Sequence, residues 1–203
     1  MPLISPGRLD DVARLLLAGE VVAIPTDTVY GLAARVDDPE AITSLATLKG
    51  RDPQQPIAVL FDALEAVAPL IDPPEVFHRL AAFWPGALTL IVPARPDAFV
   101  PLLVPRGAIG LRQPDDPLAR ELLRRCGGRL AVTSANLHGQ PAASTAAEVI
   151  AAFGDDLPVL DGGPRGDAAS TVIDLTEASP RVLREGPLTA AQLGLAPEKE
   201  GAP

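Results

Sequence analysis

Short β-branched runs alternate with stretches of helical periodicity along this chain, and that alternation most constrains its fold. The run VVAI at 21–24 is followed by a proline and has the pattern of a buried strand. Before it, residues 9–18 place Leu9, Val12 and Leu16 at helical spacing, and a glycine follows them. Strands that alternate with helices predict an α/β domain in which helices cover a sheet.

The remaining elements follow from the same periodicities. Helices are expected over 39–50, 63–71, 74–84, 116–128 and 146–153. Strands are expected over 57–61, 87–94, 108–112, 130–135, 170–175 and 181–185. Thr145 and Glu148 form a capping-box pattern at the start of the last helix. The final residues, LAPEKEGAP, have little apolar character, so we expect one domain over 1–190 and a flexible tail over 191–203.

Composition narrows the class of protein. The 203 residues carry a net charge of −9, which argues against a broad cationic surface for nucleic acid. The single cysteine, Cys126, cannot form an intrachain disulfide and fits a reducing compartment. The N-terminus has no long apolar run, and no stretch of about 18 apolar residues occurs. We therefore expect a cytoplasmic protein without a membrane segment.

Familiar catalytic signatures do not occur in the sequence. It contains no GxxxxGK[ST], no GxGxxG after a strand, no HExxH and no CxxC. His78 and His138 are far apart in the sequence and have no cysteine pattern beside them, so neither a zinc site nor a Cys-His nucleophile is expected. Cys126 is interpreted as a small apolar helix residue. No metal site is predicted.

Polar residues instead gather directly after predicted strands. PTDTVYGLA at 25–33 follows the first strand, and Thr133, Ser134 and Asn136 follow a later one. Ligands of α/β domains bind at such strand ends, where hydroxyl and amide groups can donate hydrogen bonds to phosphate. An ordinary polar turn is the alternative at both places, and neither stretch alone decides between the two interpretations.

The cationic residues can also be interpreted in two ways, as structural residues or as an anion-binding site. Lys49 and Arg51 lie just past a predicted helix, where they would stabilise its C-terminus, but they could also hold phosphate or carboxylate in a cleft. Arg112 at a strand end and Arg184 near the chain end could bind an anion or lie on the solvated surface. The glycine-rich segment 162–175 could cradle an anion with backbone N–H groups, or could simply connect two elements.

The order and spacing of these clusters are more specific than any one of them. PTDTVYGL, KGR, WPGALTLIV, IGLRQPDDP, TSANLHGQPA, STVID and LREG resemble the successive blocks of the YrdC-like family, over about residues 8–188. These are the threonylcarbamoyl-AMP synthases, called TsaC in bacteria. The resemblance implies a twisted mixed β-sheet with helices on both sides and a large central cavity. It also implies a nucleotidyltransferase that forms threonylcarbamoyl-AMP and pyrophosphate from L-threonine, bicarbonate and ATP, for N6-threonylcarbamoyladenosine in tRNA.

The resemblance also assigns roles to residues of this sequence. The implied catalytic set is Lys49, Arg51, Ser134 and Asn136. The implied ATP contacts are Arg51, Gln55, Ser134, Ala142 and Arg184, and the implied L-threonine contacts are Thr28, Arg112 and Ser170. The chain departs from some relatives at Leu60, where they carry histidine, and at Ala142, where they carry serine, which puts details of substrate contact in doubt. It stops soon after LREGPL, as the short form of the family does.

Partners follow from the same resemblance. ATP is a substrate, Mg²⁺ is expected to accompany it, and no tightly bound cofactor is expected. The tRNA threonylcarbamoyl transferase proteins are the downstream partners, and binding of tRNA itself is expected to be weak or indirect. Three alternatives stay open: an RNA- or ribosome-binding module, a carbamoyl-transfer domain of the hydrogenase-maturation type, and a nucleotide-binding paralogue with another substrate. The charge disfavours the first and the missing zinc-finger cysteines disfavour the second, but the sequence discriminates poorly against the third.

Overall fold

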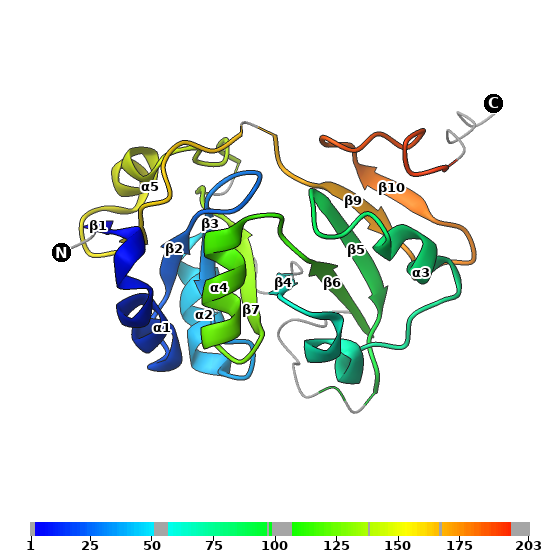
Figure 1. The fold of residues 1–203 in the computed structure, drawn as a ribbon, viewed down its shortest axis with the longest axis horizontal. Coiled ribbons are helices and arrows are strands. Elements are labelled where there is room, and N and C mark those ends of the chain that lie inside the picture. Colours follow the sequence, from blue (N-terminus) through cyan, green and yellow to red (C-terminus); the bar gives the residue numbers. More distant parts are fainter. Residues whose placement is uncertain are drawn as a thin grey trace.

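A ten-stranded mixed sheet forms the centre of the protein (Figure 1). The computed structural model describes residues 3–50, 57–96, 98, 107–137, 139–166 and 168–195. The strands are β1 Leu3–Ile4, β2 Val22–Ile24, β3 Gly31–Ala34, β4 Ala58–Phe61, β5 Leu88–Pro93, β6 Ala108–Arg112, β7 Arg129–Ser134, β8 Val159–Leu160, β9 Thr171–Asp174 and β10 Arg181–Arg184. Their order is β1-β8-β2-β3-β7-β4-β6-β5-β9-β10. β8 is parallel to β1 and β2, β4 to β6 and β5 to β9, whereas the other neighbours are antiparallel.

Helices cover both faces of this sheet. They are α1 Leu9–Leu17, α2 Pro39–Leu48, α3 Val76–Ala81, α4 Pro117–Arg125 and α5 Ala146–Phe153. The buried residues of α1 and α4 share one apolar cluster with β2, β4 and β7. Those of α2, α3 and α5 belong to a second, larger cluster that includes the opposite face of the central strands. The predicted α/β class and its two covered faces are therefore confirmed.

Side-chain caps fix where the helices begin. The Asp38 carboxylate accepts hydrogen bonds from two backbone N–H groups at the start of α2, which opens with a proline. Asp116 caps α4 in the same way. Thr145 Oγ1 accepts from the N–H of Glu148, whose carboxylate accepts from the N–H of Ser144. These local signals explain why α4 and α5 agree closely with the sequence-based expectation.

The helix expected over 63–71 was wrong, and the one over 74–84 was too long. The first segment forms two 3₁₀ turns, Leu64–Ala66 and Ala68–Leu70. Pro69 lies within it, and a proline in a helix interior removes a backbone donor and crowds the preceding turn. The strands β1, β3 and β8 were not predicted. β3 has the sequence GLAA, which has little β propensity, and its pairing with β2 and β7 makes it a strand.

Gly31 in β3 gives a prediction about stability. A Cβ at this position would lie 2.6 Å from Val132 Cγ1 and 3.2 Å from the Thr133 carbonyl oxygen. We expect Gly31→Ala to lower the free energy of unfolding by about 1–3 kcal/mol, because the added methyl group overpacks the β3–β7 pair. Urea unfolding measures this. Gly7→Ala is the control, since a Cβ there meets nothing within 4 Å, and equal stability of the two variants would contradict the packing argument.

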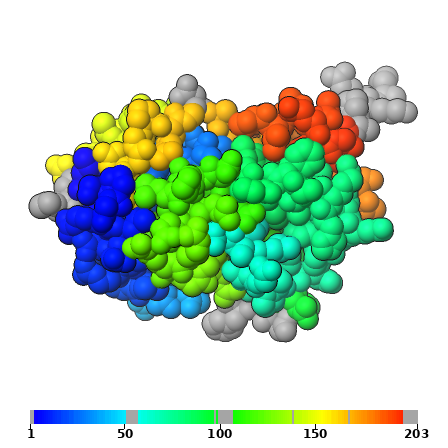
Figure 2. Space-filling model, viewed as in Figure 1, coloured from blue at the N-terminus to red at the C-terminus, as the bar shows by residue number. Residues whose placement is uncertain are grey.

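The packed chain continues past residue 190. Leu193 is buried in the larger apolar cluster, and its carbonyl accepts a hydrogen bond of 3.0 Å from Arg79 in α3. Figure 2 shows this C-terminal segment, in red, lying against the teal surface around α3. Residues 196–203 of the predicted tail lie outside the described residues, so the tail stays a prediction. In the described part of the chain, no helix has the length and apolar character needed to cross a membrane.

Candidate functional site

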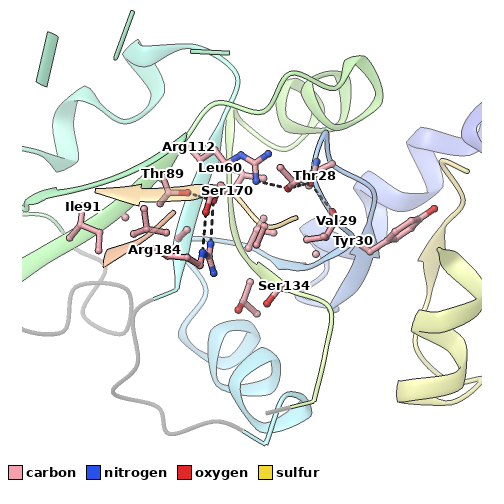
Figure 3. A pocket seen from close by; sticks show the side chains of 18 of the residues that line it. Thr28, Val29, Tyr30, Leu60, Thr89, Ile91, Arg112, Ser134, Ser170 and Arg184 are labelled. Carbon is pink, nitrogen blue, oxygen red and sulfur yellow. Dashed lines mark hydrogen bonds between the residues drawn. The ribbon is translucent and has the colours of Figure 1, made fainter. Parts of the chain in front are cut away.

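A cavity of ≈ 360 Å³ lies over the central strands (Figure 3). Side chains alternate along a strand, so one set of residues in β4, β6, β5 and β9 packs in the core and the next set faces the cavity. The cavity set is Ala58, Leu60, Gly110, Arg112, Thr89, Ile91 and Val172. Polar side chains surround this floor from the segments next to the strands. The central cavity expected from the sequence is therefore present, with an apolar floor and a polar rim.

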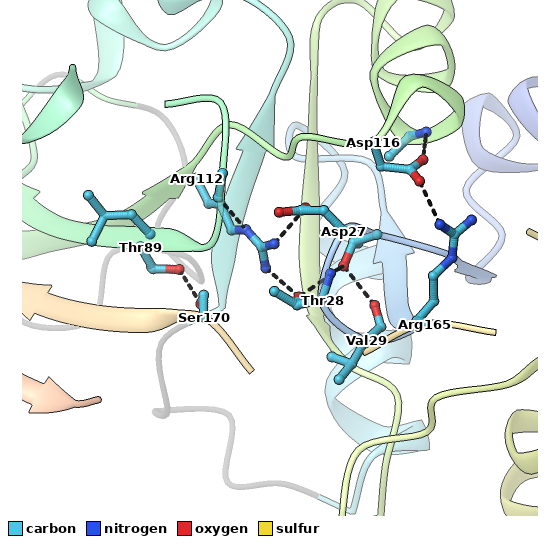
Figure 4. Close-up of polar contacts among 12 residues, drawn as sticks. Asp27, Thr28, Val29, Thr89, Arg112, Asp116, Arg165 and Ser170 are labelled. Atoms are coloured by element: carbon cyan, nitrogen blue, oxygen red, sulfur yellow. Dashed lines mark hydrogen bonds and ion pairs between the residues drawn. The ribbon is translucent and has the colours of Figure 1, made fainter. Parts of the chain in front are cut away.

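Arg112 at the end of β6 is a buried cation held by three hydrogen bonds (Figure 4). Its Nη2 donates to Asp27 Oδ1 at 2.6 Å, its Nη1 to Thr28 Oγ1 at 2.8 Å, and its Nε to the Gly86 carbonyl oxygen at 3.2 Å. A guanidinium has five N–H groups, so these bonds fix its plane and leave two N–H groups for a ligand. Two N–H groups in one plane suit a carboxylate.

The electrostatics of the cavity favour an anion. Burial lowers the pKa of the Arg112 guanidinium, and the neighbouring Asp27 carboxylate opposes that shift. Partial burial, followed by the positive charge of Arg112, lowers the pKa of Arg184. Arg184 makes no ion pair with any described residue. Because arginine stays protonated in proteins, an anion that enters between these two cations would be stabilised.

Ser170, which immediately precedes β9, connects Arg184 to the sheet. Its Oγ lies 2.8 Å from Thr89 Oγ1, and Arg184 Nε donates to its carbonyl oxygen at 3.0 Å. Arg184 Nη2 is 3.4 Å from the same Oγ. Ser170 is buried and lines the cavity with Thr28 and Arg112. The structure thus brings the three residues assigned to L-threonine around one hollow (Figure 3).

Lys49 follows α2 and reaches the end of β7. Its Nζ donates to the Ser134 carbonyl oxygen at 2.6 Å, to Ser134 Oγ at 2.9 Å and to Asn136 Oδ1 at 2.9 Å. Ser134 Oγ donates to the same Asn136 oxygen at 2.6 Å. Lys49 is only 5% exposed. A role at the helix end alone does not account for this buried ammonium, which connects α2 to the polar segment after β7.

Most residues singled out from the sequence meet at this cavity. It is lined by Thr28, Lys49, Arg112, Ser134, Ser170 and Arg184. Asn136 contacts Lys49 and Ser134 without lining the cavity, and Ala142 is partly buried away from it. Arg51 and Gln55 lie outside the described residues. The roles assigned to all of these residues stay predictions.

Three further residues shape the site and were given no individual role from the sequence, although two of them, Thr26 and Asp27, lie in the polar stretch 25–33. Asp27 is the ionic partner of Arg112. Thr26 Oγ1 donates to the Val29 carbonyl oxygen at 2.7 Å and accepts from the Thr28 N–H, which holds the loop before β3. Thr89 supports Ser170. A hydroxyl on the non-core face of an apolar strand could have indicated Thr89, whereas nothing local indicates that Asp27 pairs with a residue 85 positions away.

The glycine-rich segment after β8 is held in place as a connection. Arg165 Nη1 donates to Asp116 Oδ2 at 2.8 Å, and its Nη2 donates to the Gly162 carbonyl oxygen at 2.7 Å (Figure 4). The Tyr30 hydroxyl accepts from the Gly162 N–H and donates to the Gly163 carbonyl oxygen, both at 3.0 Å. Arg165 is therefore paired with Asp116, which also caps α4. Arg165 does not line the cavity.

Two further kinds of site were sought among the described residues: a reactive cysteine and a group of metal ligands. Burial raises the pKa of the Cys126 thiol to about 11, which disfavours the reactive thiolate. No group of three or more histidine, cysteine, aspartate or glutamate residues in the described part of the chain could hold a metal ion. His138 lies outside the described residues.

Comparison with known proteins finds similar sequences and a similar solved structure. A Mycobacterium tuberculosis protein is 41% identical over 180 residues, which cover 87% of this chain and 82% of that protein. The threonylcarbamoyl-AMP synthase of Chromohalobacter salexigens is 36% identical over 171 residues, which cover 83% of this chain and 92% of that protein. The crystal structure of P. abyssi Sua5 complexed with L-threonine matches with a TM-score of 0.89 and 32% identity, covering 95% of this chain and 60% of that chain.

A protein-family model also matches most of the sequence. The model of the Sua5/YciO/YrdC proteins, described as telomere recombination, matches residues 14–186. That span contains every residue named above as lining the cavity. The chain therefore belongs to the Sua5/YciO/YrdC family.

Proposed function

We propose that this chain is an L-threonylcarbamoyladenylate synthase, which makes threonylcarbamoyl-AMP and pyrophosphate from L-threonine, bicarbonate and ATP. The observation that carries the proposal is one cavity with Arg112, Thr28 and Ser170 on its wall together with Lys49, Ser134 and Arg184. Relatives that bear the name of this activity, and a similar structure that holds L-threonine, support it.

The amino acid is proposed to bind at Arg112. The guanidinium donates three of its five N–H groups to Asp27, Thr28 and Gly86. The other two suit the α-carboxylate of threonine. The hydroxyls of Thr28 and Ser170 border the same space and can orient the bound amino acid. This arrangement leaves the substrate's amine directed away from Arg112, where it can react.

The nucleotide is proposed to bind along Lys49, Ser134 and Arg184. The positive charge of the buried Lys49 ammonium can stabilise phosphate oxygens. Its three N–H groups bond Ser134 and Asn136, and the Ser134 hydroxyl donates to Asn136, so a direct hydrogen bond from either group to phosphate would exchange one of these bonds. Arg184 contributes a cation without an ionic partner among the described residues. Arg51, Gln55 and Ala142 are assigned to ATP from the sequence resemblance alone.

The reaction requires positioning and charge stabilisation from these residues. Threonine's amine combines with bicarbonate with loss of water, or with CO₂ with loss of a proton, to give a carbamate. A carbamate oxygen attacks the α-phosphorus of ATP, the bond to the β-phosphate breaks, and pyrophosphate leaves with the bonding electrons. Lys49 and Arg184 would stabilise the charge that develops on phosphate, and no covalent enzyme intermediate is needed. A carbamate is labile in water, so a cavity that limits solvent access would favour product formation.

The remaining partners are proposed from chemistry. Mg²⁺ commonly binds through substrate phosphates and water, so it would arrive with ATP. The labile adenylate must be consumed by a tRNA threonylcarbamoyl transferase. Direct tRNA binding by this chain, whose net charge is −9, would be weak or indirect. The compartment proposed for this reaction is the cytoplasm, which supplies its ATP and tRNA.

Pyrophosphate release tests the proposed function. The purified chain is incubated with ATP and Mg²⁺, with and without L-threonine and bicarbonate. Release that depends on both additions supports the synthase. A chain that releases no pyrophosphate under any of these conditions, but shifts tRNA in a salt-dependent gel assay, would instead be an RNA-binding module.

A further inference from the structure

Gly110 is one of the residues that line the cavity floor. It lies in β6 opposite Ile91 of β5, and Ala58 of β4 lies on its other side. A glycine in a strand interior weakens the strand and often marks a place where a ligand approaches the backbone. Its backbone is not in the left-handed region, so the fold does not require glycine for conformational reasons.

Packing does not require glycine at this position either. A Cβ at Gly110 would find its nearest heavy atoms, in Ala58 and Thr89, at 3.7 Å, which is ordinary van der Waals contact. Gly31 differs, because a Cβ there would meet Val132 at 2.6 Å. An alanine at 110 would therefore fit the protein, and its methyl group would occupy space that now belongs to the cavity.

The position of Gly110 relative to Arg112 indicates what uses that space. The two residues are separated by one residue in β6, so they share a face and their Cα atoms lie about 6.5–7 Å apart. Leu60 and Ile91 flank this part of the floor with apolar side chains. An amino acid held by its carboxylate at Arg112 could place its own small side chain against this apolar part of the floor, where Gly110 contributes no Cβ.

We propose that Gly110 determines which amino-acid side chain the cavity accepts, by leaving room for the β-methyl group of threonine. This inference rests on the proposed function and adds a residue that selects for size. Hydrogen bonds at Arg112 and Ser170 would hold threonine and serine alike, since the two differ by one methyl group. The distinction between them would then depend on contact of that methyl group with the floor.

Gly110→Ala tests the inference, with Gly7→Ala as a matched control of the same chemical change on the surface. For each protein, kcat/KM is measured for L-threonine and for L-serine by pyrophosphate release. One methyl group in an apolar pocket changes selectivity by about tenfold or more. We expect Gly110→Ala to lower kcat/KM for threonine by about that factor, with a much smaller loss for serine, and Gly7→Ala to leave the ratio unchanged.

An unchanged ratio of threonine to serine in folded Gly110→Ala, including an equal loss for both, would overturn the inference. Failure of the proposed function is recognised separately, because the unsubstituted chain would then release no pyrophosphate in response to threonine. Calorimetric binding of both amino acids to the unsubstituted chain and to Gly110→Ala tests size selection even in that case. A selective loss of threonine binding supports it, and equal binding changes contradict it.

Discussion

Replacement of Lys49 by methionine is expected to lower kcat by about 10²–10³-fold, because the positive charge beside the reacting phosphate is lost. The three N–H groups of the ammonium bond Ser134 and Asn136 at 2.6–2.9 Å, so these bonds hold its charge in place, and direct donation to phosphate would exchange one of them. Methionine has a similar length and can fill the same apolar path along the side chain, but it supplies no charge.

Pyrophosphate release measures the effect of Lys49→Met, and thermal unfolding checks that the variant is folded. L-Threonine binding, measured by calorimetry without ATP, serves as the internal control. It should change little, because the hydrogen bonds given for Lys49 go to Ser134 and Asn136, whereas threonine is assigned to Arg112, Thr28 and Ser170. A folded Lys49→Met protein with kcat within about threefold of the original would contradict the assigned role.

Arg112→Lys is expected to weaken L-threonine binding by about tenfold to a hundredfold while nucleotide binding changes little. Hydrogen bonds to charged groups contribute about 1.5–3 kcal/mol, and an ammonium cannot reproduce the planar pair of N–H groups. It also cannot contact Asp27, Thr28 and Gly86 in the way the guanidinium does. The loss should therefore appear in KM for threonine more than in KM for ATP.

Calorimetric titration with L-threonine and separate KM values for both substrates test this prediction. Arg124→Lys is the matched control, since the Arg124 side chain is 51% exposed and lies in an ion-pair network around Asp62. It should leave both KM values unchanged. If Arg112→Lys bound threonine as tightly as Arg124→Lys, the carboxylate would have to bind elsewhere.

Local signals allowed much of the fold to be predicted from the sequence. Helices α4 and α5 carry their own caps, Asp116 and Thr145, a few residues from the groups that they bind. β3 could not be predicted in this way, since GLAA becomes a strand only through pairing with β2 and β7. The segment expected as a helix over 63–71 contains Pro69, which lies in the second of its two 3₁₀ turns and disfavours a continuous helix there.

Several residues that line the cavity were singled out from the sequence, but their contacts were not predicted. The sequence resemblance identified Lys49, Ser134 and Arg112, all of which line the cavity. It did not indicate that Asp27 holds Arg112, because that ion pair joins positions 85 residues apart. Spacing along a chain reports neighbours within an element, whereas contacts between strand ends depend on the order of strands in the sheet.

A crystal structure with L-threonine and a non-hydrolysable ATP analogue bound together tests the central claim most directly. We expect both ligands in the one cavity, with the threonine carboxylate within hydrogen-bond distance of Arg112 and phosphate oxygens within that distance of Lys49 or Ser134. Occupation of separate surfaces by the two ligands, with neither at Arg112 nor at Lys49, would contradict the account.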